Sequence, residues 1–255
     1  MKLNKLCSSW QCFVISMQFL SRVPMGKTII ASDMQWAQSV YYYPLVGIVL
    51  GLLLLIVSFF LSGISPFLSA IIILTLWVAF TGALHIDGLA DCSDAWVGGQ
   101  GSREKTLRIM KDPAAGPIAV VVIVLVLLVK FAALTVLLGS PHYLALLIIP
   151  LLARSTLLAA FIYAPYANPE GIGAQVAQYL SPKLIGFCLL LSVAITVIYL
   201  PWSSALVLLS VAAAMFYLWR TECIKRLGGV TGDCMGALVE LQEVGMLLIL
   251  TLSLT

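Results

Sequence analysis

Long apolar runs separated by short polar breaks fill almost the whole 255-residue chain, and this pattern predicts a bundle of membrane-spanning helices. A transmembrane helix needs about 20 mostly apolar residues. Seven runs meet that requirement, at about 40–61, 65–84, 117–139, 142–164, 184–200, 203–219 and 236–255. We therefore predict an all-α, polytopic integral membrane bundle of about seven transmembrane helices, with residues 1–255 forming a single domain.

The first residues resemble a signal peptide, because basic residues precede an apolar run over Cys7–Leu20. Gln11, Ser16 and Gln18 interrupt this run, Arg22 follows it, and no A-x-A-like cleavage site is present. We therefore predict an interfacial or re-entrant helix that stays in the mature protein.

Composition supports a membrane protein. The chain is 62% hydrophobic and 10% charged, with a mean hydropathy of +1.08, whereas soluble domains are about 45–50% apolar. The six cysteines show neither C-x-x-C spacing nor a zinc-site pattern. The expected surroundings are a lipid bilayer, and no nucleic-acid partner is expected.

The positive charges lie on one side of the seven-span arrangement. Twelve of the fourteen Lys and Arg residues precede the first span or lie in the second, fourth and sixth connections, and only Lys130 and Arg154 fall inside spans. The positive-inside rule then places the N-terminus and these connections in the cytoplasm and the C-terminus on the far side. The polar segments at about 85–116, 165–183 and 220–235 are expected to be loops at the cytoplasmic face.

Five of the eleven acidic residues lie between Asp87 and Asp112. Asp87, Asp91 and Asp94 are spaced by four and then three residues, which places them on one face of a helix. Three carboxylates on one face suit a divalent cation, and the alternative is a solvated helix face outside the membrane. Gly88 is small enough to let a phosphate or a neighbouring helix approach them.

Basic residues follow this acidic segment after a glycine-rich turn. Arg103, Arg108 and Lys111 form a loose basic face suited to phosphate oxygens. The positive-inside effect alone is the alternative explanation. For the Lys111–Asp112 pair, a position at the start of a helix favours a functional role.

The third polar segment contains Thr231 and Asp233 just before the last span, where a helix N-terminus attracts anions. Asp233 lies seven residues before Glu240, so both are expected on one helix face. A helix cap at Asp233 and glycines packed between spans are the alternatives.

Three more polar residues lie in apolar surroundings. Arg154 lies well inside its predicted span and should meet a carboxylate, a phosphate or water. Lys130 has no partner nearby in sequence and is expected to snorkel or to lie in a helix interface. His85 points away from the acidic face, so we expect it to form hydrogen bonds and not to bind metal.

Carboxylates for a divalent cation, basic residues for phosphates and a glycine-rich segment together favour phosphoryl or nucleotidyl transfer at a membrane surface. Magnesium fits this chemistry, because it binds through a few carboxylates plus substrate phosphates. No Ser-His-Asp or Cys-His arrangement stands out in the chain.

Several motifs resemble those of the cobalamin synthase family, also called adenosylcobinamide-GDP ribazoletransferase. The most specific is D-G-L-A-D-x-x-D joined to I-M-K-D. The matching segments are L-H-I-D-G-L-A-D-C-S-D (Leu84–Asp94), I-M-K-D-P-A-A-G (Ile109–Gly116), P-Y-A (Pro165–Ala167), G-G-V-T-G-D-C-M-G-A-L-V-E (Gly228–Glu240), F-L-S-R-V-P (Phe19–Pro24) and Y-P-L-V-G (Tyr43–Gly47).

The resemblance implies a magnesium-dependent enzyme that performs the last assembly step of adenosylcobalamin. Adenosylcobinamide-GDP would react with α-ribazole, or its 5′-phosphate, and release GMP. We expect the protein in a bacterial cytoplasmic (inner) membrane. A second copy of the chain and other enzymes of cobalamin assembly are its candidate partners, and the sequence does not give the oligomeric state.

For the residues, our hypothesis gives three roles and one further group of candidates. Asp87, Asp91 and Asp94 hold magnesium; Arg103, Lys111 and Arg154 contact phosphate oxygens; Asp112 or Asp233 completes the metal site or takes the proton of the attacking hydroxyl; and His85, Thr231 and Glu240 are further polar candidates.

Two other functions compete with this one. A CDP-alcohol phosphotransferase also carries a D-G-x-A element, but its pattern continues with Arg where this chain has Asp91. A secondary transporter would place its carboxylates near the bilayer midplane, often between inverted repeats. Here they gather at one face, and no repeat is evident.

Overall fold

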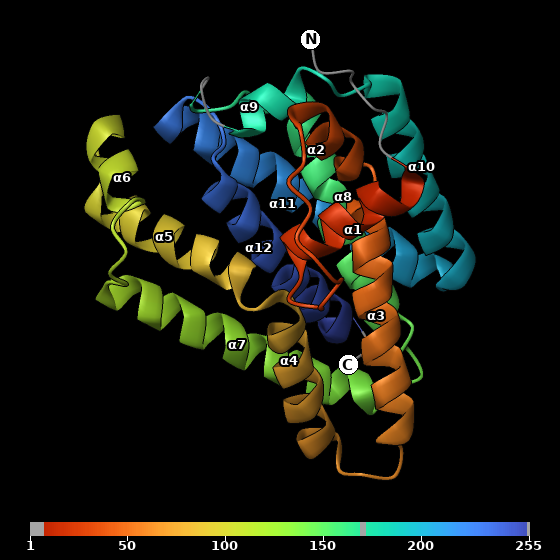
Figure 1. Cartoon of the computed structure of the whole chain (residues 1–255). Coiled ribbons are helices and arrows are strands. Elements are labelled where there is room, and N and C mark those ends of the chain that lie inside the picture. The colour runs from red at the N-terminus through yellow and green to blue at the C-terminus, as the bar shows by residue number, and fades with distance from the viewer. Residues whose placement is uncertain (1–7, 169–171, 254–255) are drawn as a thin grey trace.

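Twelve helices form within residues 8–168 and 172–253, which are the residues that the computed structural model describes (Figure 1). In chain order they are α1 (Ser9–Leu20), α2 (Asp33–Val40), α3 (Tyr43–Phe60), α4 (Pro66–Thr81), α5 (Leu84–Gly98), α6 (Arg103–Ile109), α7 (Pro117–Leu138), α8 (Ala145–Tyr163), α9 (Ile172–Ala177), α10 (Pro182–Tyr199), α11 (Trp202–Leu227) and α12 (Gly232–Leu252).

Six of these helices are long and apolar enough to cross a membrane, namely α3, α7, α8, α10, α11 and α12. The pair α4 and α5 would make a seventh span, but the pair is bent by 86°. On α7, the side chains of Val124, Leu125 and Leu128 are each about half exposed, which suits contact with acyl chains. The predicted all-α, multi-pass membrane fold is confirmed.

The core is built around α8, which is buried along most of its length and packs against α3, α10 and α12. Glycines allow α3 to lie directly on it. A methyl group at Gly51 would lie 2.6 Å from Cα of Leu147, and one at Gly47 would overlap the backbone of Pro150. Such small residues let helix backbones approach closely within a membrane.

The N-terminal segment forms the helix α1, which packs against α2 and α3. Ser8 caps it, since the Ser8 hydroxyl accepts from the Gln11 amide at 3.2 Å and the Ser8 amide donates to the Gln11 side chain at 3.2 Å. The buried Ser16 hydroxyl donates to the Ser39 carbonyl at 2.6 Å. Gln11 and Ser16, two of the polar residues that interrupt the apolar run, therefore have hydrogen-bond partners within the protein.

The bend between α4 and α5 depends on two consecutive residues in the left-handed region. Gly82 ends α4 at φ +60°, and Ala83 has the same φ. Ala83 is the one non-glycine residue with a positive φ in the described part of the chain. This conformation costs an L-residue about 1–2 kcal/mol. The strained turn sends α5 out of the direction of α4 and along α12.

The segments predicted as loops at about 85–116 and 220–235 are mostly helical, and those two expectations were wrong. α11 continues to Leu227, where Gly228 at φ +75° ends it. The basic residues end the apolar run without ending the helix, because cations near a helix C-terminus interact favourably with its dipole. α12 then starts at Gly232, after a Thr231 cap whose hydroxyl accepts from the Cys234 amide at 3.2 Å.

Candidate active site

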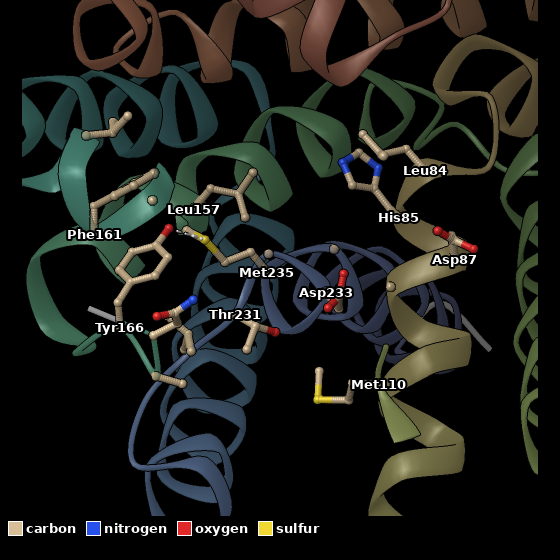
Figure 2. A pocket seen from close by; sticks show the side chains of 18 of the residues that line it. Leu84, His85, Asp87, Met110, Leu157, Phe161, Tyr166, Thr231, Asp233 and Met235 are labelled. Carbon is tan, nitrogen blue, oxygen red and sulfur yellow. Dashed lines mark hydrogen bonds between the residues drawn. The ribbon is translucent and has the colours of Figure 1, made fainter. Parts of the chain in front are cut away.

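A cavity of about 850 Å³ lies where α5 and α12 meet the end of α8 and the first three helices (Figure 2). Six of the eleven predicted site residues line it, namely His85, Asp87, Arg103, Lys111, Thr231 and Asp233. The other five, Asp91, Asp94, Asp112, Arg154 and Glu240, do not. In Figure 2, His85 and Asp87 project from α5 on one side, Phe161 and Tyr166 lie on the other, and Asp233 lies between them.

The acidic face of α5 lies against the start of α12. A methyl group at Gly88 would lie 2.7 Å from the Asp233 carbonyl oxygen, so the two backbones touch. Gly88 was predicted to let either a phosphate or a neighbouring helix approach the carboxylates. In the structure it lets a helix approach, namely α12. The negative charges of Asp233, Asp87 and Asp94 all act on the partly buried Asp91 carboxylate. Four like charges in one place call for a cation or protons to neutralise them.

Asp94 has a contact within the protein that the spacing did not predict. Its carboxylate accepts from the Gly116 amide at 2.5 Å and from the Ala119 amide at 3.0 Å. These amides belong to the unsatisfied first turn of α7, so Asp94 caps that helix from α5. The capping contact uses both carboxylate oxygens of Asp94.

Asp112 and Lys111 lie together at the exposed end of α6. The Asp112 carboxylate accepts from the Ala114 amide at 3.0 Å and stabilises the turn before α7. Lys111 lines the cavity and forms no salt bridge with any residue that the structure describes. Lys111 is therefore placed where a phosphate could reach it, and its contact with a phosphate stays a prediction, whereas Asp112 stabilises a turn outside the cavity lining.

Two of the quoted motifs lie side by side. The Val230 amide donates to the Pro165 carbonyl at 2.8 Å, and the Ala167 amide donates to the Val230 carbonyl at 2.9 Å. Arg103 closes this junction by donating to the carbonyls of Leu227 at 2.7 Å and Ala167 at 2.9 Å. Arg103 therefore positions the cavity wall, and its predicted contact with a phosphate remains a prediction.

Arg154 and Lys130 belong to a buried ionic network. Lys130 donates to Glu240 and to Glu243, each at 2.6 Å, and Arg154 forms a salt bridge with Glu243. Lys130 also lies 5.1 Å from the ring centre of Trp77. Lys130 thus lies in a helix interface, one of its two predicted surroundings. Of the partners considered for Arg154, the structure shows a carboxylate. Arg154 does not line the cavity, and its predicted contact with a phosphate stays a prediction.

His85 is 2% exposed, and both of its ring nitrogens lack a hydrogen-bond partner among the described residues. It forms part of the cavity wall. Tyr166, also on the wall, is partly buried, and burial raises the pKa of its phenol. The hydroxyl of Tyr166 donates to the Met235 sulfur at 3.0 Å.

The aromatic part of the cavity wall was missed by the sequence reasoning. The rings of Phe19, Trp36, Tyr43, Phe161 and Tyr166 all line the cavity. Phe19, Tyr43 and Tyr166 fall inside three of the quoted motifs. That position in the motifs was the available signal, but attention to charged groups left these rings without a role.

No group of three or more His, Cys, Asp or Glu side chains within residues 8–168 and 172–253 is already arranged to hold a metal ion. The donor chemistry nevertheless fits magnesium, because the cavity presents the carboxylates of Asp87 and Asp233. Magnesium usually takes one or two carboxylates and completes its coordination with water and substrate phosphates. A magnesium site therefore does not require three protein ligands that already lie close together.

Comparison with known proteins gives matches along nearly the whole chain. A family model described as cobalamin-5-phosphate synthase matches residues 12–251. An adenosylcobinamide-GDP ribazoletransferase of Pseudomonas putida strain F1 is 47% identical over 242 residues, which cover 95% of this chain and 99% of the relative. The proteins of the same name from Pseudomonas aeruginosa strain PAO1 and Stutzerimonas stutzeri strain A1501 are each 45% identical and cover 94% of this chain and 97% of the relative. No solved structure matches this chain significantly.

Proposed function

Because this chain belongs to the cobalamin-5-phosphate synthase family, we propose that it is an adenosylcobinamide-GDP ribazoletransferase, like its relatives. It joins adenosylcobinamide-GDP to α-ribazole or α-ribazole 5′-phosphate, and the second product is GMP. One observation carries the assignment to this cavity. Carboxylates from α5 and α12 share its wall with Lys111, which follows α6 and forms no salt bridge with any residue within 8–168 and 172–253.

In the proposed reaction, a ribose hydroxyl of the ribazole attacks the phosphorus atom next to the cobinamide. A new oxygen–phosphorus bond forms, and the bond from that phosphorus to GMP breaks. Lys111 lines the cavity and supplies a positive charge for the phosphate oxygens. Asp233 lines the cavity and Asp112 does not, so the proton of the hydroxyl is assigned to Asp233.

Asp87 lines the cavity and would hold magnesium from the protein side, with Asp91 next to it, while Asp233 takes the proton. Bound magnesium would neutralise charge that develops on the phosphates during transfer. The mutual repulsion of the four carboxylates supports this proposal, since a cation removes it.

We also place the protein in the bacterial cytoplasmic membrane, with the cavity at the cytoplasmic face. The support is the charge asymmetry, because Arg103 and Lys111 line the cavity and ten further basic residues fall on the same side of the predicted spans. A single cysteine introduced at Lys111 in a chain lacking its native cysteines tests this. In intact spheroplasts it should resist an impermeant maleimide, and labelling there would reverse the orientation.

The direct test uses the purified protein in lipid nanodiscs with adenosylcobinamide-GDP and α-ribazole 5′-phosphate. GMP release is expected with magnesium and should stop when the metal is chelated. Asp233→Asn should remove most of the activity while the protein remains folded. The matched control is Asp33→Asn, which changes an exposed acid in the first turn of α2. No GMP from the wild-type protein, or full activity of Asp233→Asn, would contradict the assignment.

A further inference from the structure

A second pocket, of about 500 Å³, lies between α6 and the end of α11, and we call it the basic pocket. Three cations line it, namely Arg103, Lys225 and Arg226, together with Ser102, Thr106 and the glycine-rich turn at 99–101. None of the described residues that line it is acidic. The basic pocket can therefore bind an anion without a metal ion, whereas the carboxylates of the larger cavity call for a cation.

Two of the three cations are held in place by the protein. Arg226 donates to the Trp96 carbonyl at 2.8 Å and to Glu222 at 3.3 Å, and its guanidinium lies 5.4 Å from the centre of the Trp96 ring. Arg103 donates to two backbone carbonyls, at 2.7 and 2.9 Å. Backbone carbonyls satisfy N–H donors without cancelling the positive charge. Glu222 lies outside the lining, so it compensates at most one of the three charges.

The third cation, Lys225, is exposed and forms no salt bridge with any residue within 8–168 and 172–253. The helix dipole accounts for Lys225 and Arg226, which lie in the last turn of α11. It does not account for Arg103, which lies in the first turn of α6, where the dipole disfavours a cation. Three cations that share one pocket repel one another, and a bound anion removes that repulsion.

The basic pocket lies where the lipid-facing surface of α11 ends. Tyr217 and Leu218 are largely exposed, which suits contact with acyl chains. Lys225 follows Leu218 by seven residues, about 10 Å along the helix at 1.5 Å per residue. Trp219 stacks on Trp96 with ring centroids 5.1 Å apart, and tryptophan is enriched where a membrane meets water. The pocket is therefore at the level of lipid head groups.

We propose that the basic pocket binds the phosphate group of an anionic membrane phospholipid. Guanidinium and ammonium groups hold phosphate oxygens by charge-assisted hydrogen bonds, and basic pockets between membrane helices bind lipid head groups. A zwitterionic lipid carries its own ammonium group, so it neutralises the three cations less well than an anionic lipid does. Arg103 lines both the basic pocket and the larger cavity, so the bound lipid contacts a residue that positions the cavity wall.

Native mass spectrometry of the full chain in an uncharged detergent tests this, with magnesium chelated. The protein should bind phosphatidylglycerol more tightly than phosphatidylcholine, by about fivefold or more. Lys225→Gln should weaken phosphatidylglycerol binding about fivefold, which corresponds to about 1 kcal/mol for one charge near the surface. Lys225→Arg should keep the preference. The matched control is Lys105→Gln, which changes an exposed lysine of α6 outside the pocket lining and should keep it too.

Inorganic phosphate and GMP, added at millimolar concentration, distinguish a lipid head group from a soluble phosphate. Retention of phosphatidylglycerol in their presence supports the lipid, whereas displacement by either would assign the pocket to a soluble phosphate and overturn the lipid assignment. Equal affinity for the two lipids, or an equal loss in Lys225→Gln and Lys105→Gln, would also overturn the proposal. Lipid binding is measured without substrates, so these outcomes are separate from GMP release, which tests the proposed function.

Discussion

The buried ionic network gives the sharpest stability prediction. Glu243 bonds both cations of the network, Lys130 at 2.6 Å and Arg154, and none of these three side chains is more than 2% exposed. With Glu240, the network holds two positive and two negative charges. Glu243→Gln keeps the side-chain volume but leaves one positive charge without compensation. Removing one partner of a buried pair costs about 3–5 kcal/mol.

Thermal unfolding in nanodiscs measures this cost. Each kcal/mol shifts the Tm of a chain of this size by about 2–4 °C, so a fall of roughly 6–20 °C is expected. The control is Glu222→Gln, which removes the pair between Glu222 and Arg226 at 3.3 Å on the surface of α11. Those side chains are 43% and 32% exposed, and such i,i+4 pairs contribute about 0.3–0.5 kcal/mol. Salt should weaken only the control pair.

A compensated double variant separates charge from packing. Lys130→Met together with Glu243→Gln leaves Arg154 and Glu240, one charge of each sign. The loss of unfolding free energy in the double variant should therefore be smaller than the sum of the losses in the two single variants, by about 0.5 kcal/mol or more. The reasoning is refuted if Glu243→Gln lowers the Tm no more than Glu222→Gln does, or if the two substitutions are strictly additive.

Two further substitutions test how α5 is held in place. Gly88→Ala places a methyl group 2.7 Å from the Asp233 carbonyl oxygen, so it should lower the unfolding free energy by about 1–3 kcal/mol through overpacking and should also lower kcat. The control is Gly186→Ala, which has open space around it and should leave the stability and kcat unchanged. Equal behaviour of the two variants would argue against a tight contact between α5 and α12. Asp94→Ala removes the acceptor for two amides at the start of α7. It should lower the unfolding free energy by about 0.5–2 kcal/mol, measured by denaturation in nanodiscs without magnesium. A loss of activity without any loss of stability would instead favour a role of Asp94 in binding the metal.

The sequence was sufficient to predict the features that depend on local pattern. Continuous apolar runs located the spanning helices, and the four-and-three spacing placed Asp87, Asp91 and Asp94 on one helix face, as α5 shows. The end of α11 was misplaced, because charged residues end an apolar run without ending a helix. A helix end depends on caps such as Gly228, and these are weaker signals than hydropathy.

Features that depend on distant contacts could not be predicted in the same way. Lys130 and Glu243 are 113 residues apart, and nothing local pairs them. Residue spacing grouped Asp94 with Asp87 and Asp91, because spacing shows which residues share a helix face. Spacing does not show which other parts of the protein that face contacts. In the structure Asp94 meets the amides of α7. The aromatic rings of the cavity come from two distant stretches of the chain, 19–43 and 161–166, so only the fold brings them together.

The network and the cavity are linked through α12. Asp233 lies in the first turn of this helix and Glu240 lies seven residues later, about 10 Å further along at 1.5 Å per residue. One end of the helix therefore carries a carboxylate to the cavity, and the middle is bonded to Lys130 of α7. An ionisable residue inside a membrane usually signals function. Here the intramembrane charges neutralise one another and fix α12 against α7 and α8, which supports the position of Asp233 at the cavity.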